Sequence, residues 1–255
     1  MEAEVTEIVL STRRLDKNFG SLVVARNIEL NLPKGARYAL IGPNGAGKTT
    51  LINLMTGMLK PNAGQIFLGG EDVTALEPQE RVQRGLARTF QINTLFPGLN
   101  ALEAVTLAVC ERRNIAGEFW RNVAVHREAI EEAHDILVRL RLGDSCYQVT
   151  RELPYGRQRL LEIALALATK PKVLLLDEPA AGVPQEESGD IFEAVASLSD
   201  DLTLLFIEHD MHVVFRFASH IIVLVGGAIF TEGPPAEIAA DPGVREVYLG
   251  KRKHG

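Results

Sequence analysis

The sequence predicts an α/β nucleotide-binding core with a helical insertion in its middle. Short apolar runs typical of buried strands alternate with helical segments in the first and last thirds of the chain. A glycine-rich loop at residues 42–50 lies between an expected strand and an expected helix. Between about residues 100 and 142 the apolar residues instead recur at helical spacing.

The glycine-rich loop matches the pattern G-x-x-x-x-G-K-[ST]. Residues 37–41 before it predict a strand, and residues 51–55 after it predict a helix. Glycines let backbone N–H groups surround an anion, and the helix adds its positive end. Lys48 can reach the β- and γ-phosphates of a nucleotide, and the Thr49 hydroxyl can ligate Mg²⁺. The expected phosphate-binding residues are Gly42, Pro43, Asn44, Gly45, Ala46, Gly47, Lys48, Thr49 and Thr50.

The other elements follow from periodicity. Alternation with period two predicts strands at 28–32 and 65–68. Helical spacing predicts helices across 100–142, interrupted at 114–117. Three all-apolar runs predict strands buried on both faces, and Gly226-Gly227 predicts a hairpin from the last of them into 228–230. These runs are 173–176, 204–207 and 221–225.

Composition excludes several classes of protein. The 255 residues are 46% hydrophobic and 24% charged, which is ordinary for a soluble globular protein. The formal net charge of -6 argues against a nucleic-acid binder. We expect no membrane-spanning segment and no secretion signal. Cys110 and Cys146 are expected to be reduced thiols of a cytoplasmic protein, and the basic residues 251–254 to be a solvated end or a contact with anionic lipid.

Two carboxylates end the apolar strand at 173–176. Asp177 is placed to hold Mg²⁺ through water, as the aspartate of a Walker-B strand does. Glu178 is then placed to polarise an attacking water. The alternative is a strand that finishes in two solvated acids, which the upstream phosphate loop disfavours.

Two further polar residues follow strand-like segments. His209 comes after the strand at 204–207 and could hydrogen-bond the γ-phosphate, although a lone histidine is more often structural. Gln91 follows Arg88, Thr89 and Phe90, where the core meets the helical insertion. Its amide oxygen could serve Mg²⁺ or water at a hinge, whereas an ordinary surface glutamine is the default.

Taken together and in this order, the motifs resemble those of the ATP-binding subunits of ABC transporters. The matching segments are the phosphate loop, Gln91, the signature at 153–157, the Walker-B strand at 174–178 and His209. The resemblance implies an ABC ATPase: a phosphate-loop NTPase core with an antiparallel β-subdomain and a helical subdomain. On this basis 1–91 would hold the phosphate loop and β-subdomain, about 92–160 the helical subdomain, and about 161–255 the rest of the core.

The resemblance also implies a dimer with two ATP molecules at its interface. Tyr155, Gly156 and Arg157 would face the phosphates held by the other subunit, and the helix at 160–166 would aim its positive end at them. Phe19 matches the aromatic residue that stacks on adenine, with a core phenylalanine as the alternative.

A closer resemblance is to importers of branched-chain amino acids, with those for urea and other small solutes as relatives. It rests on Leu-x-Tyr-Gly at 153–156 and on residues 178–182, 207–211 and 247–250. Such systems pair two different ATPase subunits, and 207–211 with Phe119-Trp120 are similar to the first of them. The implied partners are a second ATPase subunit, two membrane permease subunits and, indirectly, an external solute-binding protein, at the cytoplasmic face of the membrane and with no nucleic acid.

The sequence departs from the family pattern at three positions. Pro154 removes a serine hydroxyl, Arg157 stands where glutamine is usual and could supply charge to the γ-phosphate, and Pro184 replaces Asp or Asn in the loop after the Walker-B strand. The apolar loop at 93–97 could grip the permease or lie buried. Alternatives in function are an exporter subunit, for example for lipids, a regulatory ABC ATPase acting on ribosomes or DNA, and a nucleotide sensor that does not hydrolyse.

Overall fold

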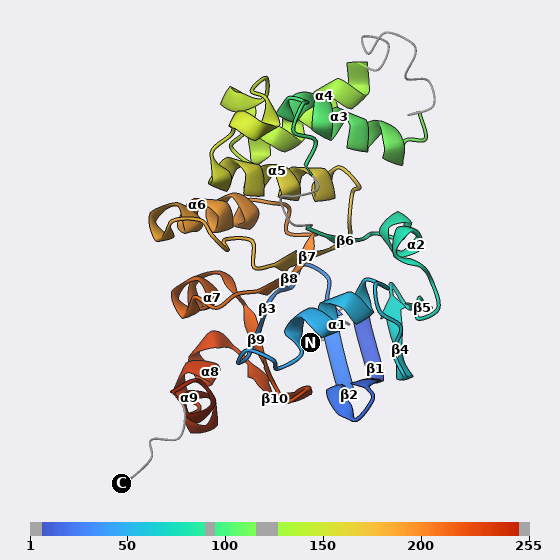
Figure 1. The fold of residues 1–255 in the computed structure, drawn as a ribbon, viewed down its shortest axis with the longest axis vertical. Coiled ribbons are helices and arrows are strands. Elements are labelled where there is room, and N and C mark those ends of the chain that lie inside the picture. The colour runs from blue at the N-terminus through green and yellow to red at the C-terminus, as the bar shows by residue number, and fades with distance from the viewer. Residues whose placement is uncertain (1–6, 90–94, 116–126, 250–255) are drawn as a thin grey trace, which may run out of the picture.

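Two β-sheets and a group of helices make up the chain (Figure 1). The computed structural model describes residues 7–89, 95–115 and 127–249. The prediction of an α/β core is confirmed, because one sheet is mostly parallel and helices connect its strands. No helix in these described ranges is long and apolar enough to cross a membrane.

The larger sheet has six strands in the order β10-β9-β3-β8-β7-β6. The five strands from β9 to β6 in this order run parallel to one another. The strand β10 pairs antiparallel with β9 through the predicted Gly226-Gly227 hairpin. The strands span β3 Arg37–Ile41, β6 Leu86–Arg88, β7 Val173–Asp177, β8 Thr203–Ile207, β9 His220–Val225 and β10 Ala228–Gly233. Their apolar runs are buried on both faces, as predicted.

The smaller sheet is antiparallel, with the order β2-β1-β4-β5. The strands predicted at 28–32 and 65–68 lie within β2 and β4, whereas β1 was not predicted because its polar residues hide the alternation. The strands span β1 Ile8–Phe19, β2 Leu22–Pro33, β4 Ala63–Leu68 and β5 Glu71–Asp72.

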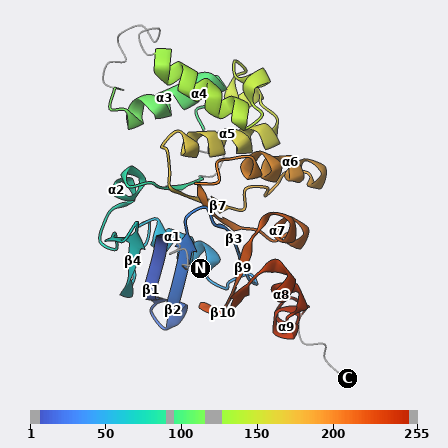
Figure 2. The same ribbon diagram turned by 180° about the vertical axis from the view of Figure 1, so that it is seen from behind.

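Successive residues of the parallel strands face two different cores. In β7, Leu174 and Leu176 face one core with the helical part of the chain, while Val173 and Leu175 face the other with α1 and the antiparallel sheet. Figures 1 and 2 show α3, α4 and α5 stacked at one end of the long axis, away from the antiparallel sheet. The helices span α1 Lys48–Met55, α2 Pro78–Gln83, α3 Ala101–Arg112, α4 Arg127–Arg139, α5 Tyr155–Leu167, α6 Gln185–Ala196, α7 Met211–Phe217, α8 Pro235–Ala240 and α9 Pro242–Leu249, with short 3-10 turns η4 Gly143–Ser145 and η5 Thr150–Glu152.

The helical prediction for 100–142 is confirmed in α3 and α4, within the described residues. Asn100 caps α3, because its side chain accepts from the backbone N–H of Glu103 and the Glu103 carboxylate accepts from the Asn100 N–H. The helix expected at 160–166 begins earlier, at Tyr155, so the signature residues form its first turn. Cys110 and Cys146 are both buried and unbridged.

Arg81 joins α1 to the segment that follows the antiparallel sheet. Its side chain is 1% exposed, and its guanidinium donates to the carbonyls of Leu54 at 2.8 Å and Met55 at 2.7 Å. It also donates to the carbonyls of Thr74 and Leu76. A buried charge of this kind is tolerated because its donors are satisfied, here by backbone carbonyls at the end of α1 and in the segment 74–76. The guanidinium therefore fixes α1 against the chain at 74–76.

Candidate functional site

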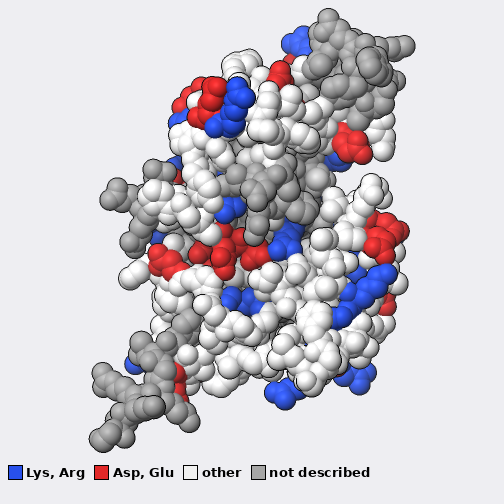
Figure 3. Space-filling model, viewed as in Figure 1, with Lys and Arg blue, Asp and Glu red and all other residues white. Residues whose placement is uncertain are grey.

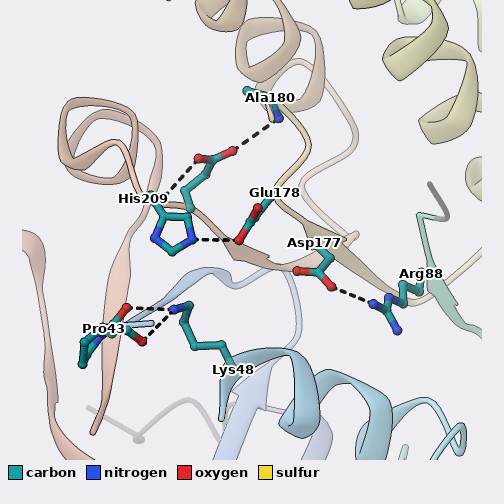
Figure 4. Close-up of polar contacts among 9 residues, drawn as sticks. Pro43, Lys48, Arg88, Asp177, Glu178, Ala180 and His209 are labelled. Atoms are coloured by element: carbon teal, nitrogen blue, oxygen red, sulfur yellow. Dashed lines mark hydrogen bonds and ion pairs between the residues drawn. The ribbon is translucent and has the colours of Figure 1, made fainter. Parts of the chain in front are cut away.

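The candidate site lies at the carboxyl ends of four parallel strands. The phosphate loop follows β3, Arg88 ends β6, Asp177 ends β7, and His209 comes shortly after β8. Parallel strands present their carboxyl ends at one edge of the sheet, where α/β proteins bind ligands. Figure 4 shows the side chains from these strands converging above α1.

The phosphate loop is held between two neighbouring backbones, which accounts for two of its glycines. A Cβ on Gly42 would lie 2.1 Å from the Leu224 carbonyl oxygen, and a Cβ on Gly47 would lie 2.4 Å from that of Val24. Both glycines also have positive φ, 156° and 103°. Only glycine fits at these positions, so the loop is closely fixed between β9 and β2.

A second set of backbone bonds fixes the same loop. The N–H of Gly227, in the β9–β10 turn, donates to the Ala46 carbonyl at 3.0 Å, and the N–H of Arg26 donates to the Gly227 carbonyl at 2.7 Å. The loop is thus bonded to the last hairpin of the large sheet, which is bonded in turn to β2.

Lys48 is folded over its own loop. Its ammonium donates to the carbonyl oxygens of Gly42 at 2.8 Å and Pro43 at 3.2 Å (Figure 4). Burial lowers the pKa of Lys48, and the nearby carboxylates of Glu178 and Asp177 act in the opposite direction. The lysine is therefore placed between the loop and the two acids. The next residue, Thr49, is exposed.

Asp177 is paired with an arginine. Arg88 donates through Nη2 to Asp177 Oδ2 at 2.6 Å and through Nη1 to Asn53 Oδ1 at 2.5 Å. The two charged side chains are only 19% and 17% exposed. The guanidinium thus connects the end of β6, the end of β7 and the face of α1.

Glu178 and His209 contact each other directly. His209 Nε2 lies 2.7 Å from Glu178 Oε1 (Figure 4). Glu178 has φ of 50°, an unfavourable conformation for a residue with a side chain, and its N–H donates to the Ile207 carbonyl. Such strained residues cluster at active sites, where the surrounding structure enforces them.

Glu208 lies behind this pair. It is 7% exposed, and its two carboxylate oxygens accept from the N–H of Ala180 at 3.3 Å and the N–H of His209 at 3.1 Å. Burial raises the pKa of Glu208, and the two backbone bonds oppose that rise. One side chain therefore holds the loop that follows Glu178 and the backbone of His209.

The signature residues open α5. Tyr155, Gly156 and Arg157 form its first turn after Pro154, whose φ of -51° suits the ring of proline. Pro184 similarly precedes α6. Arg157 is engaged within its own chain, donating to both Asp144 oxygens at 2.9 and 3.1 Å and to the Ser145 hydroxyl.

Tyr155 contacts the loop after β7. A Cβ on Gly182 would lie 3.1 Å from the Tyr155 hydroxyl oxygen. Arg159 donates to that hydroxyl at 3.0 Å and to the Ala181 carbonyl at 3.3 Å, and pairs with the buried Glu162. The start of α5 is thus joined to the loop that carries the catalytic candidates.

The other predicted residues are distributed as follows. Phe19 is 50% exposed at the end of β1, so the core alternative is wrong, and Lys17 lies 5.2 Å from its ring centre. Of the apolar loop at 93–97, Leu95 is buried and Phe96 is 53% exposed. Gln91, Phe119-Trp120, residues 93–94 and the tail at 251–254 lie outside the described residues.

Three residues join the site without having been assigned a role from sequence. Arg88 and Glu208 stand beside predicted residues, but arginines and glutamates next to a motif are too common to single out. Asn53 offered no signal, since it lies inside α1 with nothing to mark it. Only the fold brings these side chains to Asp177, Ala180 and His209.

The residues present fit a phosphate chain and a hard divalent cation. The loop is a cradle that side chains would fill, with an exposed Asn44-Gly45 tip. A hydroxyl and a carboxylate, from Thr49 and Asp177, are oxygen donors of the kind that Mg²⁺ prefers. On the face drawn in Figure 3, acidic side chains gather at mid-height with basic ones above and below them.

Comparisons with known families and proteins agree with this geometry. The family model described as ABC transporter matches residues 25–181, and the one described as Branched-chain amino acid ATP-binding cassette transporter matches residues 229–254. The chain is 36% identical over 252 residues to the high-affinity branched-chain amino acid transport ATP-binding protein BraF of Pseudomonas aeruginosa, which covers 95% of this chain and 98% of that protein.

Two solved structures are also similar. The crystal structure of the ADP conformation of MJ1267, an ATP-binding cassette of an ABC transporter, has a TM-score of 0.85 at 33% identity, covering 96% of this chain and 100% of that one. The dimeric structure of a post-hydrolysis state of the ATP-binding cassette MJ0796 bound to ADP and Pi has a TM-score of 0.73 at 25% identity, covering 89% and 98%.

Proposed function

Because the chain belongs to the ABC transporter family and is an ATPase, we propose that it powers an importer of branched-chain amino acids or of a related small organic solute. The similarity to BraF over nearly the whole chain supports this solute class, and so does the family match at 229–254. The exporter and regulatory alternatives have no comparable support.

The observation that carries the catalytic part of the proposal is the contact between His209 and Glu178. His209 Nε2 lies 2.7 Å from Glu178 Oε1, and the Glu178 carboxylate is close enough to Lys48 to act on its pKa. A carboxylate held by an imidazole beside a phosphate cradle is placed to orient a water molecule.

In the proposed mechanism each residue has one task. Glu178 orients the attacking water and accepts its proton, while His209 exchanges its contact with Glu178 for a hydrogen bond to the γ-phosphate. Lys48 leaves its loop carbonyls to neutralise the phosphates, and the loop N–H groups bind them. Thr49, Asp177 and Gln91 would hold Mg²⁺, which supplies charge neutralisation for the phosphate chain. Phe19 would stack on adenine.

The signature residues act in the proposed dimer. Tyr155, Gly156 and Arg157 of one subunit would face the nucleotide of the other, with the N-terminus of α5 directed at its phosphates. The dimeric structure of MJ0796 supports such an assembly. The remaining proposed partners are a second ATPase subunit, two permease subunits and, through them, an external solute-binding protein, with this chain at the cytoplasmic face of the membrane.

A pull-down from native membranes tests the proposal. Tagged Glu178→Gln protein with ATP is expected to trap the closed dimer and to recover two hydrophobic permease subunits and a second ATPase of similar size. Uptake of radiolabelled leucine, isoleucine and valine is then compared in cells with and without the gene, with urea as the related solute.

The outcomes separate the claims. Recovery of ribosomes, of nucleic acid or of the bait alone would contradict the transport proposal and leave the ATPase intact. Recovery of the permease with unchanged uptake of all four solutes would contradict the solute class only.

A further inference from the structure

We propose that Arg88 is a positioning residue that orients the Asp177 carboxylate toward the metal. The inference rests on the proposed function, because it takes Asp177 as a residue that holds Mg²⁺. It concerns a side chain for which the catalytic scheme has no task.

Arg88 makes two short hydrogen bonds, one to Asp177 and one to Asn53. Arg88 Nη2 lies 2.6 Å from Asp177 Oδ2, and Nη1 lies 2.5 Å from Asn53 Oδ1. Both charged side chains are more than four-fifths buried. A charge-assisted bond of this length between partly buried groups is among the stronger hydrogen bonds in proteins.

The arginine is itself held in place. It ends β6, whose register sets Arg88 beside Leu175 of β7, and the next residue donates from Thr89 N–H to the Leu175 carbonyl at 3.0 Å. The Arg88 guanidinium then reaches Asp177, two residues further along β7, and Asn53 on α1. Two acceptors on two elements fix the plane of the guanidinium.

The fixed guanidinium determines where the carboxylate points. Within the described part of the chain, Arg88 is the one side chain that hydrogen-bonds Asp177, and it takes Oδ2. Oδ1 is therefore the oxygen left to accept from metal-bound water. Groups that hydrogen-bond a metal-ligating carboxylate in this way tune the affinity for the metal, and their loss costs about 10- to 100-fold.

A purely electrostatic role for Arg88 predicts the opposite effect on Mg²⁺ affinity. If the arginine were only a positive charge near the site, it would repel Mg²⁺, and its removal would strengthen binding of the metal. A lysine at position 88 would keep that charge but could not bridge two acceptors in one plane. The sign of the effect and the behaviour of lysine therefore separate orientation from charge.

The test measures binding rather than turnover. A fluorescent ADP analogue, N-methylanthraniloyl-ADP, is titrated with EDTA present and then with a series of Mg²⁺ concentrations. The variants are Arg88→Gln, Arg88→Lys and Asn53→Ala, with Arg84→Gln as the matched control. Arg84 is a partly exposed arginine at the C-terminal end of α2, paired with Glu71.

The half-saturating Mg²⁺ concentration is expected to rise about 10-fold or more in both Arg88 variants. It should rise less, in the same direction, in Asn53→Ala. Affinity measured in EDTA should stay within about 3-fold of wild type, since the phosphate loop is unchanged. Arg84→Gln should match wild type throughout.

Two results would overturn the inference. The first is a half-saturating Mg²⁺ concentration in Arg88→Lys equal to that of wild type. The second is a half-saturating Mg²⁺ concentration in Arg88→Gln below that of wild type. If circular dichroism shows that Arg88→Gln is unfolded, the Mg²⁺ titrations of Arg88→Lys and Asn53→Ala test the inference instead. Wild-type protein that does not bind the analogue, or binds it without any response to Mg²⁺, would contradict the proposed function itself.

Discussion

His209 Nε2 lies 2.7 Å from Glu178 Oε1, although the two residues follow different strands. The strands β7 and β8 are adjacent and parallel, with Asp177 opposite Ile207, so the residues just beyond each strand end meet. The pairing therefore follows from the register of the two strands.

Changing Glu178 to Gln should separate binding from chemistry. The amide keeps the shape of the side chain and loses the base, so phosphate release should fall by about 10²- to 10⁴-fold. Affinity for the fluorescent ADP analogue should change by less than about 3-fold, because the phosphate loop is untouched. Glu131→Gln, on the exposed face of α4, serves as the control. Normal turnover in Glu178→Gln would remove the catalytic assignment.

Glu208 is expected to support ATP turnover indirectly, through its contacts with the backbone of Ala180 and His209 rather than with nucleotide. In Glu208→Ala the N–H groups of Ala180 and His209 lose their acceptors, so the loop after Glu178 and the backbone of His209 are released. We expect turnover to fall about 10-fold or more with little change in analogue affinity. Glu208→Gln keeps one acceptor oxygen and should lose less. An equal loss in nucleotide affinity would indicate general unfolding instead.

Gly182 and Tyr155 should be coupled. Gly182 has φ of 78°, and a Cβ there would lie 3.1 Å from the Tyr155 hydroxyl oxygen. Gly182→Ala is therefore expected to lower the free energy of unfolding by about 1 kcal/mol from backbone strain alone. It should also displace Tyr155. Because Tyr155→Phe removes the crowded oxygen, the double variant should be less destabilised than the sum of the two single changes, as measured by urea unfolding. If the two changes in unfolding free energy simply add, the contact between residues 182 and 155 does not contribute to stability.

Glu132 provides a test against pH. Arg112 and Arg113 donate to its Oε2, Lys170 pairs with its Oε1, and these partners lower the pKa of Glu132 to about 2. A lowered carboxylate pKa stabilises the fold above the unfolded value of 4.5 and loses that contribution as pH falls toward 2. Glu132→Gln should thus lose about 2 kcal/mol of unfolding free energy at pH 7. The difference from wild type should shrink at pH 3.

The control for that measurement lies on the same helix. Glu131 is 59% exposed, and among the residues that the structure describes it pairs only with the exposed Arg127 four residues earlier. Glu131→Gln should cost less than about 0.5 kcal/mol at either pH. A pH-independent loss in Glu132→Gln would mean that its carboxylate is not charge-stabilised.

Much of the core could be predicted because each strand tip carries its own local signal. The phosphate loop, Asp177, Glu178 and His209 each follow an apolar run, and a parallel sheet brings such ends together. The apolar runs of β7, β8 and β9 were predicted because both faces are buried. Twisted β1 was missed, since its exposed residues interrupt the alternation.

What could not be predicted depends on contacts between distant segments. Nothing local shows that Arg88 reaches Asn53 and Asp177, or that Arg81 reaches the end of α1. The start of α5 at Tyr155 was not predicted, because the apolar residues that indicate the helix begin only at Leu160. Arg157 illustrates the same limit, because its pairing with Asp144 is set by how η4 packs against α5.

The contacts that confine the phosphate loop also order events during synthesis of the chain. The Ala46 carbonyl accepts from the Gly227 N–H, and Gly42 lies against the Leu224 carbonyl, so the loop is enclosed by residues that are synthesised long after the loop itself. A nascent chain that already contains the whole glycine-rich loop still lacks β9 and the turn at Gly227, against which the loop is fixed. Because β9 and the turn after it form that part of the surroundings, a chain released before β9 is expected to retain ATP poorly.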